Sequence, residues 1–199
     1  MPTIPPDYLE RVYAGLLGKM IGIRLGAPVE PAIWTYERIR DVYGEVTSYL
    51  KPYKNFAADD DANGPVYFIR PLLEKIEGAL KRVARDDGDA HGDGSIEAAF
   101  EREISSTHLE DASIEAGEVA AAWLNYAREG IGMFWWGGYG RSTEHTAYLN
   151  LKNGIPAPES GSIVRNGKIV AEQIGGQIFI DTWGLVWPGN PVKAAEFAA

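Results

Sequence analysis

The sequence predicts a helical protein of one domain, residues 1–199, and three observations lead to that fold class. Apolar residues recur at spacings of three and four along several segments, as they do on one face of an amphipathic helix. Pro or Gly stands at the ends of those segments, where helices commonly begin or stop. The 199 residues are 45% apolar and 24% charged, which is typical of a soluble globular domain with a core.

The first predicted helix starts after Asp7 and ends before Pro28. It carries an apolar stripe together with four glycines, at positions 15, 18, 22 and 26. Each glycine costs a helix roughly 0.5–1 kcal/mol relative to Ala, so we expect the helix to pack tightly in the core. A membrane dimer face has similar small-residue spacing, but Lys19 and Arg24 interrupt any such span.

Further helices are predicted along the chain from the same periodicity and from stop signals such as Gly44 and Asn153-Gly154. They cover residues 35–43, about five turns from Val66, then 96–103, 109–128, 144–153 and 191–199. A helix across residues 173–181 would align Gln173, Gln177 and Asp181 in one polar stripe. Because its neighbours are apolar, that stripe indicates buried hydrogen bonds or the wall of a site.

The strongest chemical signal is the acidic run Asp59-Asp60-Asp61 just before the helix at Val66. One interpretation is a helix N-terminus, where carboxylates accept hydrogen bonds from free N–H groups and the helix dipole favours negative charge. The other is a Mg²⁺ site, because adjacent carboxylates repel one another unless a cation or water screens them. Both interpretations place the run at the same helix end, so helix position alone does not separate them.

Two other segments have a structural and a functional interpretation each. The aromatic and Gly-rich residues 130–140 either cap the core or stack on a ligand base. Residues 87–98 partly imitate a calcium loop, but Ala98 stands where the bidentate Glu is required. The three histidines, His91, His108 and His145, have no spacing that suggests a shared metal, and we interpret them as structural or exposed.

Composition excludes several classes of function. A formal net charge of −9 argues against nucleic acid or an anionic membrane as the main partner. The absence of cysteine excludes disulfides, thiolate nucleophiles and zinc–thiolate sites. No signal pattern and no long uncharged apolar run is visible, so a cytoplasmic location is expected.

Four segments, taken in order, resemble the ADP-ribosylglycohydrolase family, and the resemblance spans nearly the whole chain. They are the Gly-rich helix and its end at residues 13–30, the acidic run, residues 147–161, and residues 172–191 with Glu172-Gln173-Ile174-Gly175-Gly176-Gln177. The resemblance implies an all-α fold whose cleft holds two Mg²⁺ ions. It also implies hydrolysis of the bond between ADP-ribose and a protein or small-molecule acceptor.

By that resemblance Asp60 and Asp61 are expected to bind Mg²⁺ and take part in catalysis. Asp59 assists as a metal ligand, although it stands where the family commonly has a hydroxyl, and Ala62 lacks the family's second hydroxyl. Glu30 is expected to be an acid/base or substrate-positioning carboxylate, or else a surface residue at a helix end. Gln177 and Asp181 are assigned to the wall of the cleft, where they support substrate or ligand groups.

The family's second metal cluster, Asp-x-Asp-Thr/Ser, is not found in these 199 residues. The chain is therefore expected to cover the N-terminal portion of the fold, incomplete at its C-terminus, as a fragment, a degenerate relative, or one half of a complementing pair. Self-association is a related expectation, because a partial core exposes apolar surface. Alternatives to a hydrolase are a non-catalytic module that binds ADP-ribose or a nucleotide, and a purely structural helical protein.

Overall fold

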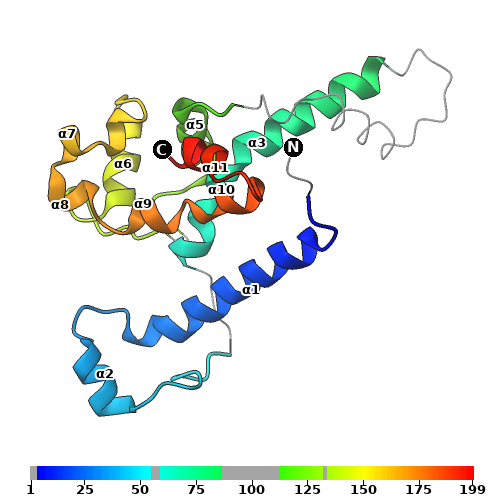
Figure 1. Ribbon diagram of the computed structural model, residues 1–199. Helices are drawn as coiled ribbons and strands as arrows, with labels where there is room; N and C mark the ends of the chain where they lie inside the picture. Colours follow the sequence, from blue (N-terminus) through cyan, green and yellow to red (C-terminus); the bar gives the residue numbers. More distant parts are fainter. Residues whose placement is uncertain (1–3, 55–58, 87–112, 132–133) are drawn as a thin grey trace.

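A computed structural model describes residues 4–54, 59–86, 113–131 and 134–199. These residues form helices joined by turns, with no strand beyond an isolated bridge between Arg128 and Ile131, so the all-α prediction is confirmed (Figure 1). The α-helices are α1 (Tyr8–Gly26), α2 (Tyr36–Tyr43), α3 (Asp60–Asp86), α5 (Ala116–Tyr126), α6 (Thr143–Lys152), α7 (Ile163–Asn166), α8 (Lys168–Ala171), α9 (Gly175–Ile178), α10 (Asp181–Val186) and α11 (Pro191–Ala198).

Most predicted helix ends are confirmed, because local side chains set them. Thr35 accepts a hydrogen bond from the Arg38 N–H at the start of α2, and Gly44 ends that helix with a φ of 68°. Ser142 caps α6 in the same way, and Gly154 follows that helix with a φ of 81°. A φ in this range strains any residue with a Cβ, so glycine is the residue that fits.

The helix predicted at residues 109–128 begins later, at Ala116. Glu115 and Glu118 form a reciprocal capping box there, in which each accepts a hydrogen bond from the other's backbone N–H. This local motif places the start of the helix after the described residues 113–115. The predicted helix at 96–103 and the calcium-like loop at 87–98 lie outside the described residues, as do His91 and His108.

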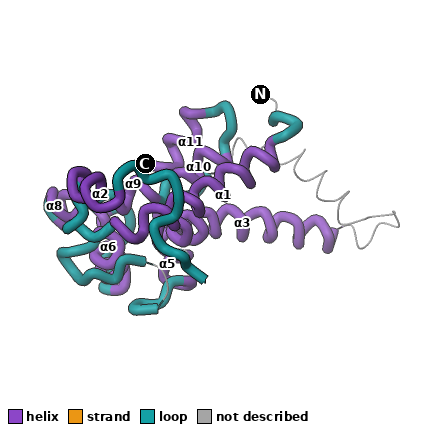
Figure 2. The backbone as a smooth tube through the Cα atoms, turned by 90° about the horizontal axis from the view of Figure 1, so that it is seen from below, coloured by secondary structure: helices purple, strands orange, loops and turns teal. Residues whose placement is uncertain are grey.

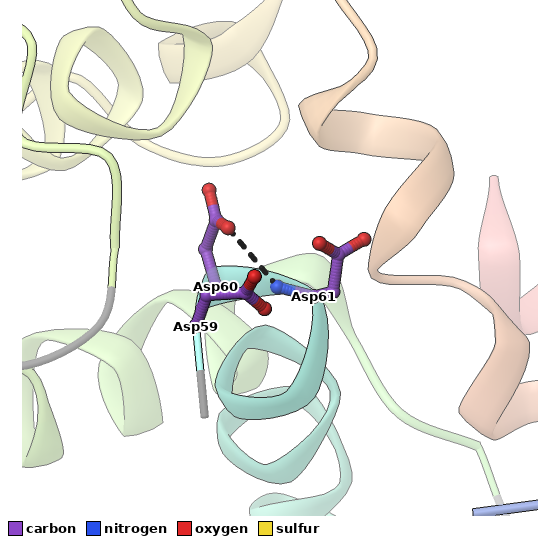
Figure 3. A group of neighbouring side chains, drawn as sticks. All are labelled: Asp59, Asp60 and Asp61. Carbon is purple, nitrogen blue, oxygen red and sulfur yellow. Dashed lines mark hydrogen bonds between the residues drawn. The ribbon is translucent and has the colours of Figure 1, made fainter. Parts of the chain in front are cut away.

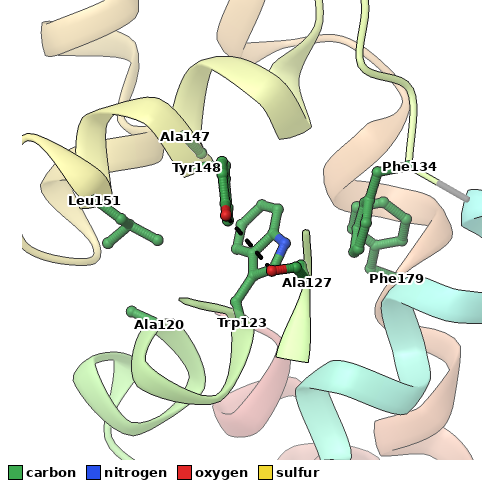
Figure 4. Close-up of a cluster of buried hydrophobic side chains, with 8 residues drawn as sticks. All are labelled: Ala120, Trp123, Ala127, Phe134, Ala147, Tyr148, Leu151 and Phe179. Atoms are coloured by element: carbon green, nitrogen blue, oxygen red, sulfur yellow. Dashed lines mark hydrogen bonds between the residues drawn. The ribbon is translucent and has the colours of Figure 1, made fainter. Parts of the chain in front are cut away.

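The buried core joins α5 and α6 to Phe134, at the start of a described segment, and to the turn after α9 (Figure 4). Aromatic rings dominate it. The ring centroids of Trp123 and Phe134 are 5.4 Å apart, and those of Phe134 and Phe179 are 5.7 Å apart. The first turns of α3 approach this core at Gly64, where a Cβ would collide with the Phe179 ring. The cluster comprises Ala120, Trp123, Ala127, Phe134, Ala147, Tyr148, Leu151 and Phe179.

The prediction that α1 packs tightly in the core is wrong. The helix forms as expected and lies along α3 in both views, but none of its residues is buried (Figures 1 and 2). Around Gly18, Gly22 and Gly26 an added Cβ would meet no described atom within 4 Å. These three glycines therefore reflect no close approach by any described element. A groove of about 430 Å³ with a mainly apolar lining remains between α1, α3 and α10.

Residues 168–186 form three short helices, α8, α9 and α10, rather than a continuous one. The predicted polar stripe is therefore broken, and its three members face different surroundings. Asp181, at the start of α10, accepts a hydrogen bond from Lys19 Nζ at 2.7 Å, which ties α1 to this region. Among the described residues, no helix is long and apolar enough to cross a membrane.

Candidate functional site

Three carboxylates project from the first turn of α3 (Figure 3). The Asp59 carbonyl accepts a hydrogen bond from the Asn63 N–H at 3.1 Å, so Asp59 stands at the N-cap position just before α3 begins at Asp60. Asp60 Oδ1 accepts one from the Asp61 N–H at 3.1 Å. The N-terminal position predicted for the acidic run is thus confirmed, and one of its carboxylates does bond a free backbone N–H.

Capping does not account for the remaining carboxylate oxygens. One oxygen from each of Asp59, Asp60 and Asp61 lies within 4.8 Å of the other two. Asp59 Oδ1 is buried and has no hydrogen-bond partner among the described residues. A buried carboxylate oxygen without a partner is costly, and a hard divalent cation binds oxygen donors of this kind. The donor set therefore fits Mg²⁺ or a similar ion.

The electrostatics of the cluster agree with that fit. Burial, followed by the charges of Asp61, Asp60 and Glu30, raises the pKa of Asp59 to about 6. Burial and the neighbouring Asp61 also raise the pKa of Asp60. Both shifts mean that the charged forms are destabilised in the metal-free chain. A bound cation would remove that penalty.

The cluster opens into a cavity of about 1060 Å³. Five parts of the chain meet around it: the 3₁₀ helix η1 (Ala27–Val29) with the residues after it, the start of α3, residues 134–135, the start of α6, and the turn into α9. The residues that line it are Ala27, Glu30, Pro31, Ala32, Asp59, Asp60, Asp61, Phe134, Trp135, Glu144, Gln173, Ile174, Gly175 and Ile178.

Glu30 is brought to the same cavity as the aspartates, although it lies far from them in sequence. Its side chain is largely exposed at the end of η1. Partial burial, and then the charges of Asp60 and Asp61, raise its pKa. The cavity thus brings Glu30, Asp59, Asp60 and Asp61 together.

Gln177 and Asp181, the two residues predicted for the cleft wall, lie elsewhere. Gln177 is exposed on α9 and does not line the carboxylate cavity. Asp181 lines the apolar groove beside α1 instead. The member of the stripe that does line the cavity is Gln173, whose Nε2 donates to the Arg141 carbonyl at 2.9 Å.

Glu144 was not predicted as a site residue, yet it lines the cavity from the first turn of α6. Its side chain is buried, and burial, followed by the charge of Asp60, raises its pKa. In the sequence it reads as an ordinary acidic residue in a helix N-terminus. The only sequence signal is its position, two residues after the cap Ser142, which also fits a solvated side chain.

The aromatic segment supplies one core residue and one residue of the cavity wall, and stacking on a ligand base stays a prediction. Phe134 is a core residue, whereas Trp135 is 52% exposed and lines the cavity. Gly137 makes room for the indole, since a Cβ there would come within 2.7 Å of Trp135 Cε2. His145 is structural: Nδ1 accepts from the Gly138 N–H at 3.0 Å, and Nε2 lies 3.0 Å from a Glu129 oxygen.

No curated protein and no solved structure matches the chain. One family model does match it, over residues 4–199, and its description is ADP-ribosylglycohydrolase. That range contains every residue of the carboxylate cavity. With a match across nearly its full length and an all-α fold, the chain belongs to the ADP-ribosylglycohydrolase family.

Proposed function

We propose that this chain hydrolyses an ADP-ribosyl linkage in a Mg²⁺-dependent reaction at the carboxylate cavity. The family is of hydrolase type, acts on ADP-ribosylated substrates and generally uses divalent metals. The observation that carries the proposal is the meeting of Glu30, Asp59, Asp60 and Asp61 around one large cavity, with a buried Asp59 oxygen left without a partner among the described residues. A solvated acidic surface would leave no such oxygen buried.

The cation is held in this proposal by Asp59, Asp60 and Asp61. Mg²⁺ bound there would offset the mutual repulsion of the carboxylates and polarise a substrate oxygen. The second ion expected from the family resemblance has no corresponding cluster among the described residues, where the three aspartates are the one group of this kind.

Glu30 is proposed to act on the attacking water. The pKa of Glu30 is raised toward neutral pH, and a general base works best when its pKa lies near the pH of the reaction. It reaches the cavity from η1, whereas the aspartates reach it from α3, so the two groups can lie on different sides of a substrate. The aspartates orient the substrate and Glu30 takes the proton from water.

The rest of the lining suits a ligand that is partly aromatic and partly polar. Trp135 presents an exposed ring to the cavity, and stacking on such a ring is a common way to hold a base. The volume of about 1060 Å³ is slightly above the typical range of ligand cavities, about 300–1,000 Å³. An ADP-ribosyl group is a ligand of this kind, because its base is aromatic and its riboses and diphosphate are polar.

The test is release of ADP-ribose from N-linked and O-linked ADP-ribosyl substrates, with Mg²⁺ and with a chelator. We expect turnover only with the cation. Replacing Asp60 and Asp61 together by Asn should lower the rate by at least about 100-fold, the upper range for groups that support a metal. The matched control is Asp41→Asn, because Asp41 is an exposed carboxylate on α2 away from the cavity.

A folded chain that gives no cation-dependent release would contradict the proposal. If that chain still binds ADP-ribose in calorimetry, the alternative of a non-catalytic binding module takes its place. The same assay tests Gln177→Ala and Asp181→Ala, whose assignment to the substrate region remains a prediction.

A single domain over residues 1–199, the cytoplasmic location and self-association are likewise kept as proposals.

A further inference from the structure

Glu144 is unusual among the polar residues of α6. Its side chain is 3% exposed, and Oε2 is buried without a hydrogen-bond partner among the described residues. Other buried polar side chains of the helix are satisfied. Thr146 Oγ1 donates to the Ser142 carbonyl, and Asn150 Nδ2 donates to the Ser160 carbonyl at 2.8 Å. Packing alone would not favour a carboxylate at this position, because an unpaired buried charge is costly.

The backbone beside Glu144 leaves room for its carboxylate. A Cβ on Gly175 would collide with Oε1 and come within 2.9 Å of Cδ of Glu144. Thr143 Oγ1 donates to the Val170 carbonyl at 2.7 Å, and this bond holds the approach to Gly175 against the start of α6. The carboxylate of Glu144 therefore occupies a space that only a glycine at position 175 leaves open.

Glu144 and the three aspartates line one cavity but come from different helices. The aspartates also contain an unpartnered buried oxygen, on Asp59. One oxygen of Glu144 and one of Asp59 are thus buried without a partner among the described residues on two neighbouring elements, and a cation bound between these elements would stabilise both carboxylates in their charged forms. No Lys or Arg side chain lines that cavity among the described residues.

The group of oxygens that lie within 4.8 Å of one another contains the three aspartates but not Glu144. We propose that Glu144 is a fourth carboxylate of the cation site, binding the divalent ion of the Asp59–Asp61 cluster through one of its waters. Mg²⁺ usually keeps several waters, so a carboxylate beyond the immediate ligands can still bind the hydrated ion. The proposal rests on the proposed function only for the presence of the cation. It also assigns a purpose to Gly175, which makes room for the carboxylate.

The experiment measures Mg²⁺ binding by calorimetry and Mn²⁺ binding by electron paramagnetic resonance, with no substrate present. Glu144→Gln keeps the shape and removes the charge. We expect affinity to fall about 10-fold or more, as for groups that support metal ligands. Glu172→Gln is the matched control, because Glu172 is an exposed Glu near the same turn and does not line the cavity. It should leave affinity unchanged.

Thermal unfolding separates this role from a structural one. Removing an unpaired buried charge should raise the melting temperature of the metal-free chain, by about 2–4 °C for each kcal/mol gained in a chain of this size. The rise in melting temperature on adding Mg²⁺ should shrink in the same variant. A residue that only supports the fold would lower the metal-free melting temperature and leave cation affinity unchanged.

A second variant keeps the proposal testable through Gly175. Gly175→Ala should displace the carboxylate and weaken cation binding, and the loss should be smaller when Glu144 is already Ala. If Asp60→Asn abolishes binding but Glu144→Gln matches the wild type, the role of Glu144 is overturned and the aspartate site stands. If the wild-type chain binds neither cation, both proposals are overturned.

Discussion

Helices α1 and α6 were both predicted from the sequence, but in the structure α1 is not buried whereas α6 is. α1 is the more apolar, yet none of its 19 residues is buried. α6 reads Thr-Glu-His-Thr-Ala-Tyr-Leu-Asn-Leu-Lys, and seven of its 10 residues are buried. Apolar periodicity therefore indicates a face that gains from burial but does not say whether a partner covers it.

The polar side chains of α6 can be buried because most of them find partners in neighbouring loops. Asn150 donates to the Asn166 side chain at 2.8 Å, and His145 is bonded at both ring nitrogens. Buried hydrogen-bonded groups avoid the cost of desolvation, so burial does not require an apolar sequence. Glu144 is the exception, and it faces the cavity that we assign to the cation and substrate.

The largest expected effect comes from making the same substitution, Tyr to Ala, in the buried helix α6 and in the exposed helix α1. Tyr148 on α6 is 5% exposed and Tyr13 on α1 is 68% exposed. Tyr148→Ala should lower the free energy of unfolding by about 3–5 kcal/mol, as for other buried aromatics. Tyr13→Ala should change it by about 0.5 kcal/mol or less, since it removes an exposed ring. Urea denaturation of both variants measures the difference; equal losses would mean that α1 is covered in solution.

A pair of glycine substitutions examines backbone approach in α3 and α1. Gly64→Ala places a Cβ against the Phe179 ring and should destabilise the fold by about 1–3 kcal/mol. Gly18→Ala meets no described atom within 4 Å and should stabilise α1 by about 0.5–1 kcal/mol. Denaturation midpoints report both effects. A destabilising Gly18→Ala would show that another surface approaches α1 at this point.

The smallest expected effect is the pH dependence of the unsatisfied carboxylates. The pKa of Asp59 is raised in the folded chain, from 3.8 to about 6. Its contribution to stability is therefore fully present below about pH 3.8 and is lost as the pH rises through about 6. The metal-free wild type should lose stability relative to Asp59→Asn over this window. Cation affinity should run the opposite way and weaken below about pH 6, because protons compete for the same oxygens.

Denaturation of the wild type and Asp59→Asn in chelator, at several pH values across that window, measures the first effect. Calorimetry with Mg²⁺ measures the second. The exposed pair of Arg165 and Glu159 offers a control, since removing that Glu should not change the pH dependence of cation binding. A flat difference between wild type and Asp59→Asn would contradict the raised pKa.

Within the site, the residues that could be predicted were those whose chemistry shows in a local run. Asp59, Asp60 and Asp61 are adjacent, and three neighbouring carboxylates have few inexpensive structural roles. Glu30 was found through the family resemblance, which placed it at the end of the Gly-rich helix. Glu144 could not be found in this way, because a single Glu in a helix N-terminus is usually solvated.

The choice between Gln173 and Gln177 shows the same limit. A continuous helix would have placed both on one face, but the turn between α8 and α9 separates them. Only Gln173 lines the cavity. The direction of each side chain depends on where the backbone turns, and that follows from the packing of residues 170–175 against α6 rather than from spacing along the chain.

By itself the sequence determined the longer helices, most of their ends, the acidic run and the family, because these depend on neighbouring residues and on local hydrogen bonds. Tertiary structure alone decided that α1 stays exposed, that α6 is buried, and that Glu144 joins Asp59, Asp60 and Asp61 around one cavity. The physical reason is that burial and charge repulsion depend on which distant segments meet. No periodicity within a single helix carries that information.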